Sequence, residues 1–166
     1  MDYTFAHAAP GEVKDIFMLY EKRVKWMNDH DIQQWNVTSY LEVYPVEYYE
    51  NQCRQGNLYV LKYEDRIVGA VILIQSDDRW LDRMDSSAYY IHNLVTDPAM
   101  RGVGKCIMKE VEKQAIRHEK QFIRLDCAKD NAFLNQYYES LGYSLAGSCK
   151  DGDYIGNRRE KRLTIY

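Results

Sequence analysis

The chain has 166 residues, of which 46% are hydrophobic and 28% are charged, and its formal net charge is −3 at pH 7. These values are typical of a globular domain with one sizeable core, so we expect a single domain over residues 1–166. The mild acidity argues against binding to bulk nucleic acid or to an anionic membrane, and no stretch approaches the length of a membrane span.

The cysteine pattern indicates reduced thiols. Cys53, Cys106, Cys127 and Cys149 form no C-x-x-C pair, and no histidine lies at metal-ligand spacing. We therefore expect a cytoplasmic protein without disulfides and without a metal site. The first residues, M-D-Y-T-F-A, lack the basic region and the apolar run of a signal peptide, which agrees with this location.

The first third of the chain predicts one strand and two helices. Weak alternation predicts a strand over residues 3–8, and Pro10 suits the first turn of a following helix. That helix should end near residues 29–31, and its core-facing positions are Val13, Ile16, Phe17, Tyr20, Val24 and Met27. Pro45 opens a second short helix, and Gly56 follows its end.

The segment between these two helices has no clear period and carries three large aromatic side chains, Trp35, Tyr40 and Tyr44. Each of them alone is explained by anchoring a loop to the core. Together they make this segment the candidate substrate-facing loop, because binding residues are concentrated on loops. We therefore predict that these three residues bind the substrate.

The rest of the chain predicts six more strands and two helices. Strands are expected at residues 57–63, 66–75, 89–96, 122–128, 143–149 and 161–166, and helices from residue 103 to about 120 and from 131 to 141. Glu64 and Asp65 form the tight turn of a hairpin, residues 77–87 form a polar loop, and residues 150–160 form a charged loop. This order predicts an α/β or α+β fold, in which about four helices flank a mixed, mostly antiparallel sheet of six to seven strands.

The centre of the chain holds a short basic turn, R-G-V-G-K at residues 101–105, between the strand at 89–96 and a helical pattern. Such a turn can aim several backbone N–H groups at one point, and the helix N-terminus adds its partial positive charge. Glycines allow an anion to approach the backbone closely. The turn is therefore a candidate phosphate site, and the alternative is a turn with a purely structural role.

Three phosphate-binding patterns compete for this turn. A Walker-type loop requires G-x-x-x-x-G-K-[ST], but Ala99 stands at its first glycine and Cys106 at its hydroxyl residue. A dinucleotide fingerprint requires G-x-G-x-x-G, but Ile107 stands at its third glycine. We reject both patterns. The turn instead resembles the R-x-x-G-x-G/A motif with which the GNAT superfamily of N-acetyltransferases grips the pyrophosphate of acetyl-CoA. Arg101 and Gly104 match this motif, and Cys106 is a small departure from its last position.

A second motif strengthens the resemblance. Residues 131–143, N-A-F-L-N-Q-Y-Y-E-S-L-G-Y, resemble the GNAT pattern N-x-x-A-x-x-L-Y-E-K-L-G-F, with Leu134 in place of Ala and Tyr143 in place of Phe. The matching positions are Asn131, Tyr138, Glu139, Leu141 and Gly142. Residues 94–104, L-V-T-D-P-A-M-R-G-V-G, likewise resemble L-A-V-x-P-x-x-R-G-x-G. The two motifs occur in the family's order and at about its spacing, so we identify the chain as a member of this superfamily.

The resemblance implies a GNAT-like fold and an enzyme that moves the acetyl group of acetyl-CoA directly to a primary amine. The backbone of the strand end would pair with the pantetheine amides, the turn would hold the pyrophosphate, and an asparagine side chain would hydrogen-bond the cofactor. A backbone N–H near the strand end would also stabilise the oxyanion. The cofactor-binding residues implied are Leu94, Val95, Thr96, Arg101, Gly102, Val103, Gly104, Lys105, Cys106, Asn131 and Tyr138.

Two residues are the candidate catalytic groups. The resemblance implies that Tyr138 is the general acid that returns a proton to the CoA thiolate, and a phenol holds its proton at neutral pH. His92 is the candidate base, and two-residue alternation places it on the same strand face as Tyr90, Leu94 and Thr96. The alternatives are core packing for Tyr138 and a half-buried, hydrogen-bonded histidine for His92.

The acceptor is the least determined part of the reaction, because fold and cofactor site do not fix it. Residues 29–45, 77–87 and 150–160 lack family signal and are expected to build its pocket. Asp29, Asp31 and Glu42 are further candidates for a base or for attraction of a cationic substrate. We favour a small-molecule amine, and a peptide N-terminus stays open.

Two alternatives to direct transfer by an enzyme are open, and assembly of the chain is a separate expectation. A non-catalytic acyl-CoA-binding module on the same fold would keep the turn and lack the acid or base. A covalent route through Cys106, at a helix N-terminus, is disfavoured because no base is adjacent in the sequence. The superfamily often forms dimers, so a homodimer is an expectation of the resemblance alone.

Overall fold

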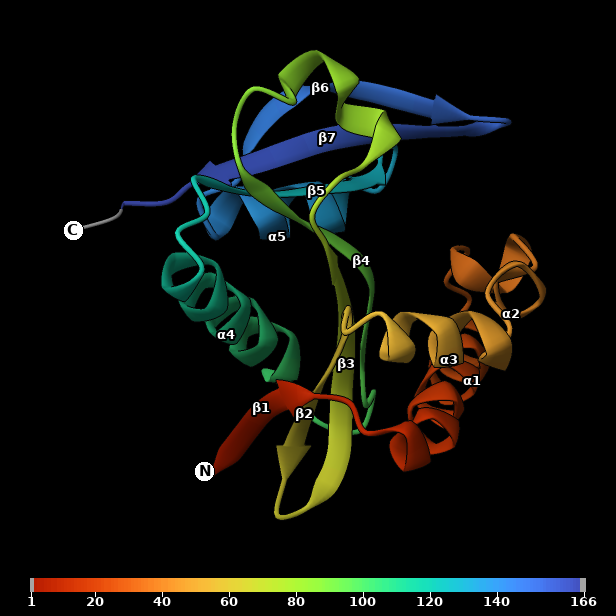
Figure 1. Ribbon diagram of the computed structural model, residues 1–166. Helices are drawn as coiled ribbons and strands as arrows, with labels where there is room; N and C mark the ends of the chain where they lie inside the picture. Colours follow the sequence, from red (N-terminus) through yellow and green to blue (C-terminus); the bar gives the residue numbers. More distant parts are fainter. Residues whose placement is uncertain (1, 165–166) are drawn as a thin grey trace. The chain divides into compact units, whose positions relative to one another are not determined.

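The computed structural model describes residues 2–164, which divide into two compact units (Figure 1). The first unit comprises the chain up to Leu73 together with Asn93–Glu110, and the second comprises Ile74–His92 together with the chain from Val111 onward. Strand β4 (Ala88–Thr96) and helix α4 (Val103–Arg117) each contribute residues to both units. The expectation of a single domain stays a prediction.

The sheet of the first unit begins with three antiparallel neighbours, β1 (Tyr3–His7), β2 (Leu58–Tyr63) and β3 (Arg66–Ile74). The predicted hairpin is confirmed, because Glu64 and Asp65 join β2 to β3 with φ angles of 47° and 63°. Two consecutive left-handed residues match the twist of the flanking strands. The end of β4 lies beside β3 in this unit, where the Asp97 N–H donates to the Val68 carbonyl at 2.8 Å.

Three helices and two short 3-10 segments complete the first unit. The predicted first helix is confirmed as η1 (Pro10–Glu12) followed by α1 (Val13–Asp29), and the second as α3 (Val46–Arg54). The predicted stripe of α1 faces the core, since Val13, Ile16, Tyr20 and Met27 are buried. The aperiodic segment between the helices forms η2 (Trp35–Val37) and α2 (Tyr40–Val43).

The second unit contains a four-stranded arrangement in the order β4-β5-β7-β6 (Figure 1). Strand β5 (Phe122–Ala128) runs parallel to β4, whereas β7 (Tyr154–Arg162) and β6 (Ser144–Asp151) add antiparallel pairs. Helix α5 (Ala132–Ser140) packs on β5, and η3 (Asp78–Arg83) lies within the predicted polar loop. Within residues 2–164, the predicted mixed, mostly antiparallel sheet is confirmed with seven strands, and the short helices raise the helix number above the predicted four.

The prediction for the C-terminal strand was wrong. Residues 150–160 are mostly strand rather than loop, since β6 reaches Asp151 and β7 begins at Tyr154 after a turn in which Gly152 has a φ of 58°. The charged run was misleading because Arg158 and Arg159 are buried and make tertiary contacts. Arg158 pairs with Asp82 at 2.5 Å, and Arg159 donates to the Tyr143 carbonyl at 3.1 Å. The last two positions of the predicted strand, residues 165–166, lie outside the described residues.

No helix within residues 2–164 has both the length and the apolar character that a membrane span requires.

Candidate active site

Strand β4 carries an irregularity at Asn93, whose φ is 51°. A left-handed non-glycine residue inside a strand is strained and needs support from its surroundings. Three tyrosines of the first unit supply it. The Tyr20 hydroxyl donates to the Asn93 carbonyl at 2.5 Å, the Tyr48 hydroxyl donates to Asn93 Oδ1 at 3.0 Å, and Asn93 Nδ2 donates to the Tyr40 hydroxyl at 2.5 Å.

The conformation of Asn93 corrects one prediction. The shared face of His92, Leu94 and Thr96 was inferred from unbroken two-residue alternation, and the left-handed residue interrupts that alternation. Val95 is almost fully buried, while Leu94 and Thr96 are half-buried.

The three aromatic residues predicted to bind substrate lie together in the first unit. Trp35 stacks on Tyr40 with ring centroids 4.2 Å apart, and Tyr40 contacts Tyr44 at 4.9 Å. Tyr44 in turn contacts Tyr48 at 4.9 Å, so this aromatic cluster is continuous with the side chains that hold Asn93. Burial raises the pKa of Tyr48 to about 12, and the neighbouring Tyr44 adds to the shift. Tyr48 therefore stays a neutral donor at physiological pH.

Helix α1 fixes the end of β4. The Arg23 guanidinium donates to the Thr96 carbonyl at 2.7 Å and to the Thr96 hydroxyl at 2.6 Å. Lys22 donates to the buried Asp97 carboxylate at 2.7 Å, and the same oxygen accepts from the Ala99 N–H at 2.9 Å. These contacts position the chain just before the basic turn, and sequence patterns gave no signal for those of Arg23 and Lys22 because they join residues 73 and 75 positions apart.

The basic turn has the geometry of a helix N-terminal anion site. Gly102 has a φ of 80°, which favours glycine, and the Cys106 N–H donates to the Gly102 carbonyl at 3.1 Å in the first turn of α4. The N–H groups before Cys106 have no intrahelical acceptor, as at every helix start. Arg101 and Lys105 are exposed, whereas Val103 is fully buried and anchors the turn. The predicted role of these residues in cofactor binding stays a prediction.

In the second unit, His92 is paired with an acidic residue that the sequence analysis missed. His92 Nε2 lies 2.8 Å from Asp77 Oδ2, and the other carboxylate oxygen accepts from the Arg79 N–H at 2.9 Å. Burial alone would raise the pKa of Asp77, but the hydrogen bonds from His92 and from the Arg79 N–H lower it below its ordinary value. The only sequence signal for Asp77 is an acidic residue able to cap the short helix that follows it.

The second unit also holds the predicted general acid. Tyr138 lies on α5, half-buried, with Tyr137 and Tyr143 packed edge-on against its ring. Burial raises its pKa well above the ordinary value, and the Cys127 thiol adds to the shift, so the phenol keeps its proton at neutral pH. Within residues 2–164, no hydrogen bond to the Tyr138 hydroxyl is found. Asn131 caps α5, because its Oδ1 accepts from the Leu134 N–H at 3.0 Å.

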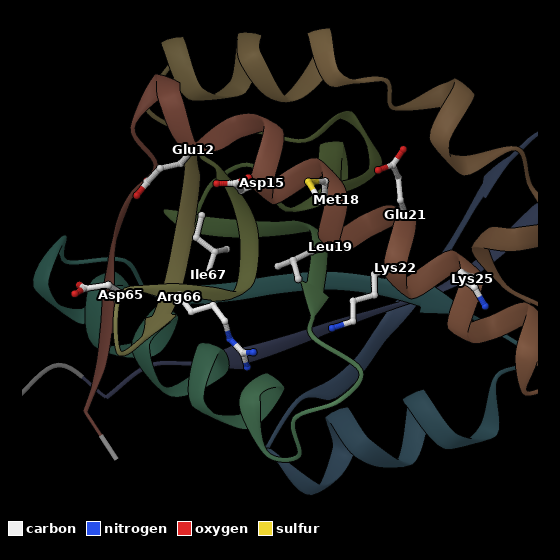
Figure 2. A pocket seen from close by; sticks show the side chains of 10 residues that line it. All are labelled: Glu12, Asp15, Met18, Leu19, Glu21, Lys22, Lys25, Asp65, Arg66 and Ile67. Atoms are coloured by element: carbon white, nitrogen blue, oxygen red, sulfur yellow. The ribbon is translucent and has the colours of Figure 1, made fainter.

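The first unit has a groove of about 770 Å³ along α1 and the β2–β3 turn (Figure 2). None of the predicted site residues lines it. Its basic side chains all have a partner, since Lys22 and Arg66 lie 2.7 and 3.9 Å from the Asp97 carboxylate and Lys25 lies 2.6 Å from that of Asp29. Across residues 2–164, no group of three or more His, Cys, Asp or Glu side chains is arranged to hold a metal ion.

Comparison with known proteins places these features in a family. The model of the acetyltransferase (GNAT) family matches residues 29–143. The uncharacterized N-acetyltransferase YesJ of Bacillus subtilis (strain 168) is 25% identical over 169 residues, which cover 95% of this chain and 91% of YesJ.

Two solved structures share the fold. A GNAT-family acetyltransferase from Listeria monocytogenes 4b F2365 is 27% identical, with a TM-score of 0.82, and the match covers 97% of this chain and 95% of that one. The PaiA N-acetyltransferase from Thermoplasma acidophilum, solved with coenzyme A, is 16% identical, with a TM-score of 0.75, covering 98% of this chain and all (100%) of that one. The family match spans more than half of the sequence, and the chain therefore belongs to the GNAT family of acetyltransferases.

Proposed function

We propose that the protein transfers the acetyl group of acetyl-CoA directly to a primary amine, and that the acceptor is a small molecule. The observation that carries the proposal is the turn before α4, where Gly102 exposes the first N–H groups of the helix between Arg101 and Lys105. This turn lies within the part of the chain that the GNAT model matches. The coenzyme A bound to the PaiA structure supports the choice of cofactor.

Cofactor binding in this proposal divides among three groups of residues. The N–H groups from Gly102 to Cys106 hold the pyrophosphate, and the side chains of Arg101 and Lys105 neutralise its charge. The backbone of residues 94–96 pairs with the pantetheine amides as an added strand would. Asn131 uses its Oδ1 for the helix cap, which leaves its amide NH₂ to donate to the cofactor.

The chemistry requires that the acceptor ammonium lose two protons and that the leaving thiolate gain one. His92 takes a proton from the acceptor ammonium, and the freed nitrogen lone pair attacks the thioester carbonyl carbon. The Val95 N–H stabilises the oxyanion that forms. As the intermediate collapses, the C–S bond breaks and Tyr138 gives its proton to the leaving thiolate. The second proton that the nitrogen loses on forming the amide then passes to the Tyr138 phenolate and restores the neutral phenol. The raised pKa of Tyr138 suits this role, because the phenol is protonated when the thiolate leaves.

The aromatic cluster is proposed to contact the acceptor. Trp35 and Tyr44 are half-buried and so keep surface for a ligand. Tyr40 is buried and contacts both of these rings, so it holds them in place. Aromatic faces attract a cationic ammonium group, which fits an amine substrate. Asp29, Asp31 and Glu42 are not used in this proposal.

Calorimetric titration with acetyl-CoA tests the cofactor assignment, with ATP and NADH as control ligands. We expect micromolar binding of acetyl-CoA alone, and no binding by Gly104→Trp, because the indole would fill the space over the helix start. Unchanged affinity of this variant would contradict the pyrophosphate assignment.

A panel of small amines and N-terminal peptides, with detection of the CoA thiol, then tests turnover. Binding without turnover on any acceptor would favour the non-catalytic module, and turnover on peptides alone would replace the small-molecule acceptor.

A further inference from the structure

The contact between His92 and Asp77 is more constrained than a surface ion pair. His92 Nε2 lies 2.8 Å from Asp77 Oδ2, and the side chains are 22% and 9% exposed. The second oxygen of the carboxylate, Oδ1, accepts from the Arg79 N–H at 2.9 Å at the start of η3. Both oxygens are therefore engaged, and the carboxylate is fixed by backbone on one side while it holds the imidazole on the other.

This arrangement determines which ring nitrogen carries the proton. Asp77 is a carboxylate at neutral pH and can only accept hydrogen bonds, so neutral His92 must donate through Nε2–H. The lone pair of the neutral ring then lies on Nδ1. Within residues 2–164, the hydrogen bonds found for His92 use Nε2, which leaves Nδ1 to exchange a proton with a ligand.

The other charged groups near this pair are satisfied by separate contacts. The Arg79 guanidinium reaches away from Asp77 to Asp126 at 3.1 Å and to Asp151 at 3.1 Å. The Tyr154 hydroxyl donates to Asp126 at 2.6 Å. Arg79 is thus shared between Asp126 and Asp151, which leaves one negative charge in excess in this group, and Asp77 is the carboxylate that His92 contacts.

We infer that Asp77 is a positioning residue, which holds His92 in its Nε2–H tautomer so that Nδ1 accepts the proton of the acceptor ammonium. The inference rests on the proposed function. One N–H bond of the ammonium breaks and its electron pair stays on the amine nitrogen, while the proton bonds to Nδ1. The resulting imidazolium is stabilised by the adjacent carboxylate, which stays unprotonated.

Asp77→Asn tests this role with little disturbance of the fold. The Asn carbonyl oxygen can still accept from the Arg79 N–H, because asparagine is as good a helix cap as aspartate. Its NH₂ group then faces His92 Nε2, which must become an acceptor, so the proton moves to Nδ1. We expect kcat to fall by roughly 10²-fold, the lower end of the range for general base catalysis, with the Kd for acetyl-CoA unchanged.

Two further variants separate positioning from a structural role. Asp78→Asn removes the same charge from the next residue, which is exposed, and should keep wild-type kcat. In a His92→Ala background, Asp77→Asn should cause no further loss, because its effect acts through the imidazole. If Asp77→Asn lowers kcat by the same factor with and without His92, the carboxylate acts only on the structure and the inference is overturned.

Nitrogen NMR of the His92 ring gives a readout that does not depend on activity. We expect the Nε2–H tautomer in the wild type and the Nδ1–H tautomer in Asp77→Asn. An active wild type whose Asp77→Asn variant keeps its kcat or its tautomer overturns the inference. A wild type that acetylates no amine on the panel instead refutes the proposed function, so the two failures are distinguishable.

Discussion

Gly69 on β3 lies where the strand, the end of β4 and the start of α4 meet within the first unit. A Cβ added at Gly69 would lie 2.5 Å from Ile107 Cδ1, 3.2 Å from the Val95 carbonyl oxygen and 3.3 Å from Val103 Cγ1. Ile107 and Val103 are fully buried, so neither side chain can swing into solvent. We therefore predict that Gly69→Ala pushes the first turn of α4 away from the sheet.

The change in unfolding free energy caused by Gly69→Ala is the sum of two opposing terms. Forcing a methyl group into a packed core costs about 1–3 kcal/mol, and replacing glycine by alanine returns about 0.4–1 kcal/mol by restricting the unfolded chain. The expected net loss of unfolding free energy is roughly 1–2 kcal/mol, which for a chain of this size lowers Tm by roughly 2–8 °C. Because Val103 directly follows the basic turn, acetyl-CoA binding should weaken several-fold as well.

Urea unfolding followed by circular dichroism measures the stability change, and calorimetry measures the affinity. Gly11→Ala is the matched control, because it adds the same atom where no atom lies within 4 Å of the new Cβ. Equal urea midpoints for Gly69→Ala and Gly11→Ala would refute the reasoning, since the added methyl would then meet no resistance. A stability loss without any change in acetyl-CoA affinity would show that the position of Val103 does not control the turn.

Two other substitutions separate catalysis from folding and give a pH dependence. Tyr138→Phe should lower kcat by at least roughly 10²-fold, because it removes the proposed general acid. It should leave the Kd for acetyl-CoA and the urea midpoint nearly unchanged, because the lost hydroxyl has no hydrogen bond among residues 2–164. Unaltered turnover would show that another residue is the acid. Asp97→Asn should cost about 1–2 kcal/mol at pH 7, because Lys22 loses its charged partner. Burial alone would raise the pKa of Asp97, but hydrogen bonds from Lys22 and the Ala99 N–H and the charge of Arg66 lower it. A depressed carboxylate pKa contributes stability above the unfolded value near ~3.9, and this contribution is lost as the pH falls through the folded value. The difference in unfolding free energy between wild type and Asp97→Asn should therefore shrink as the pH falls from 5 to the acid limit. A difference that stays constant with pH in urea unfolding would contradict the lowered pKa of Asp97.

Much of the fold could be predicted because its signals are local. The hairpin at Glu64 and Asp65, the stripe of α1 and the strand-turn-helix around the basic turn depend on residues within a few positions of one another. Two motifs in family order then indicated the GNAT fold and its cofactor chemistry. The prediction failed at β7, because Arg158 and Arg159 have the charge pattern of a solvated loop. In the structure both are buried against tertiary partners, which the sequence does not reveal.

The sequence by itself determined the family, the positions of Arg101, Gly104 and Tyr138 within its motifs, and the aromatic character of the segment around Tyr40. The tertiary structure alone decided the left-handed conformation of Asn93, because its strain is offset by hydrogen bonds from tyrosines 45 to 73 residues away. It also decided the pairing of His92 with Asp77. A carboxylate before a short helix is an ordinary cap in sequence, and only folding brings it within 2.8 Å of the imidazole.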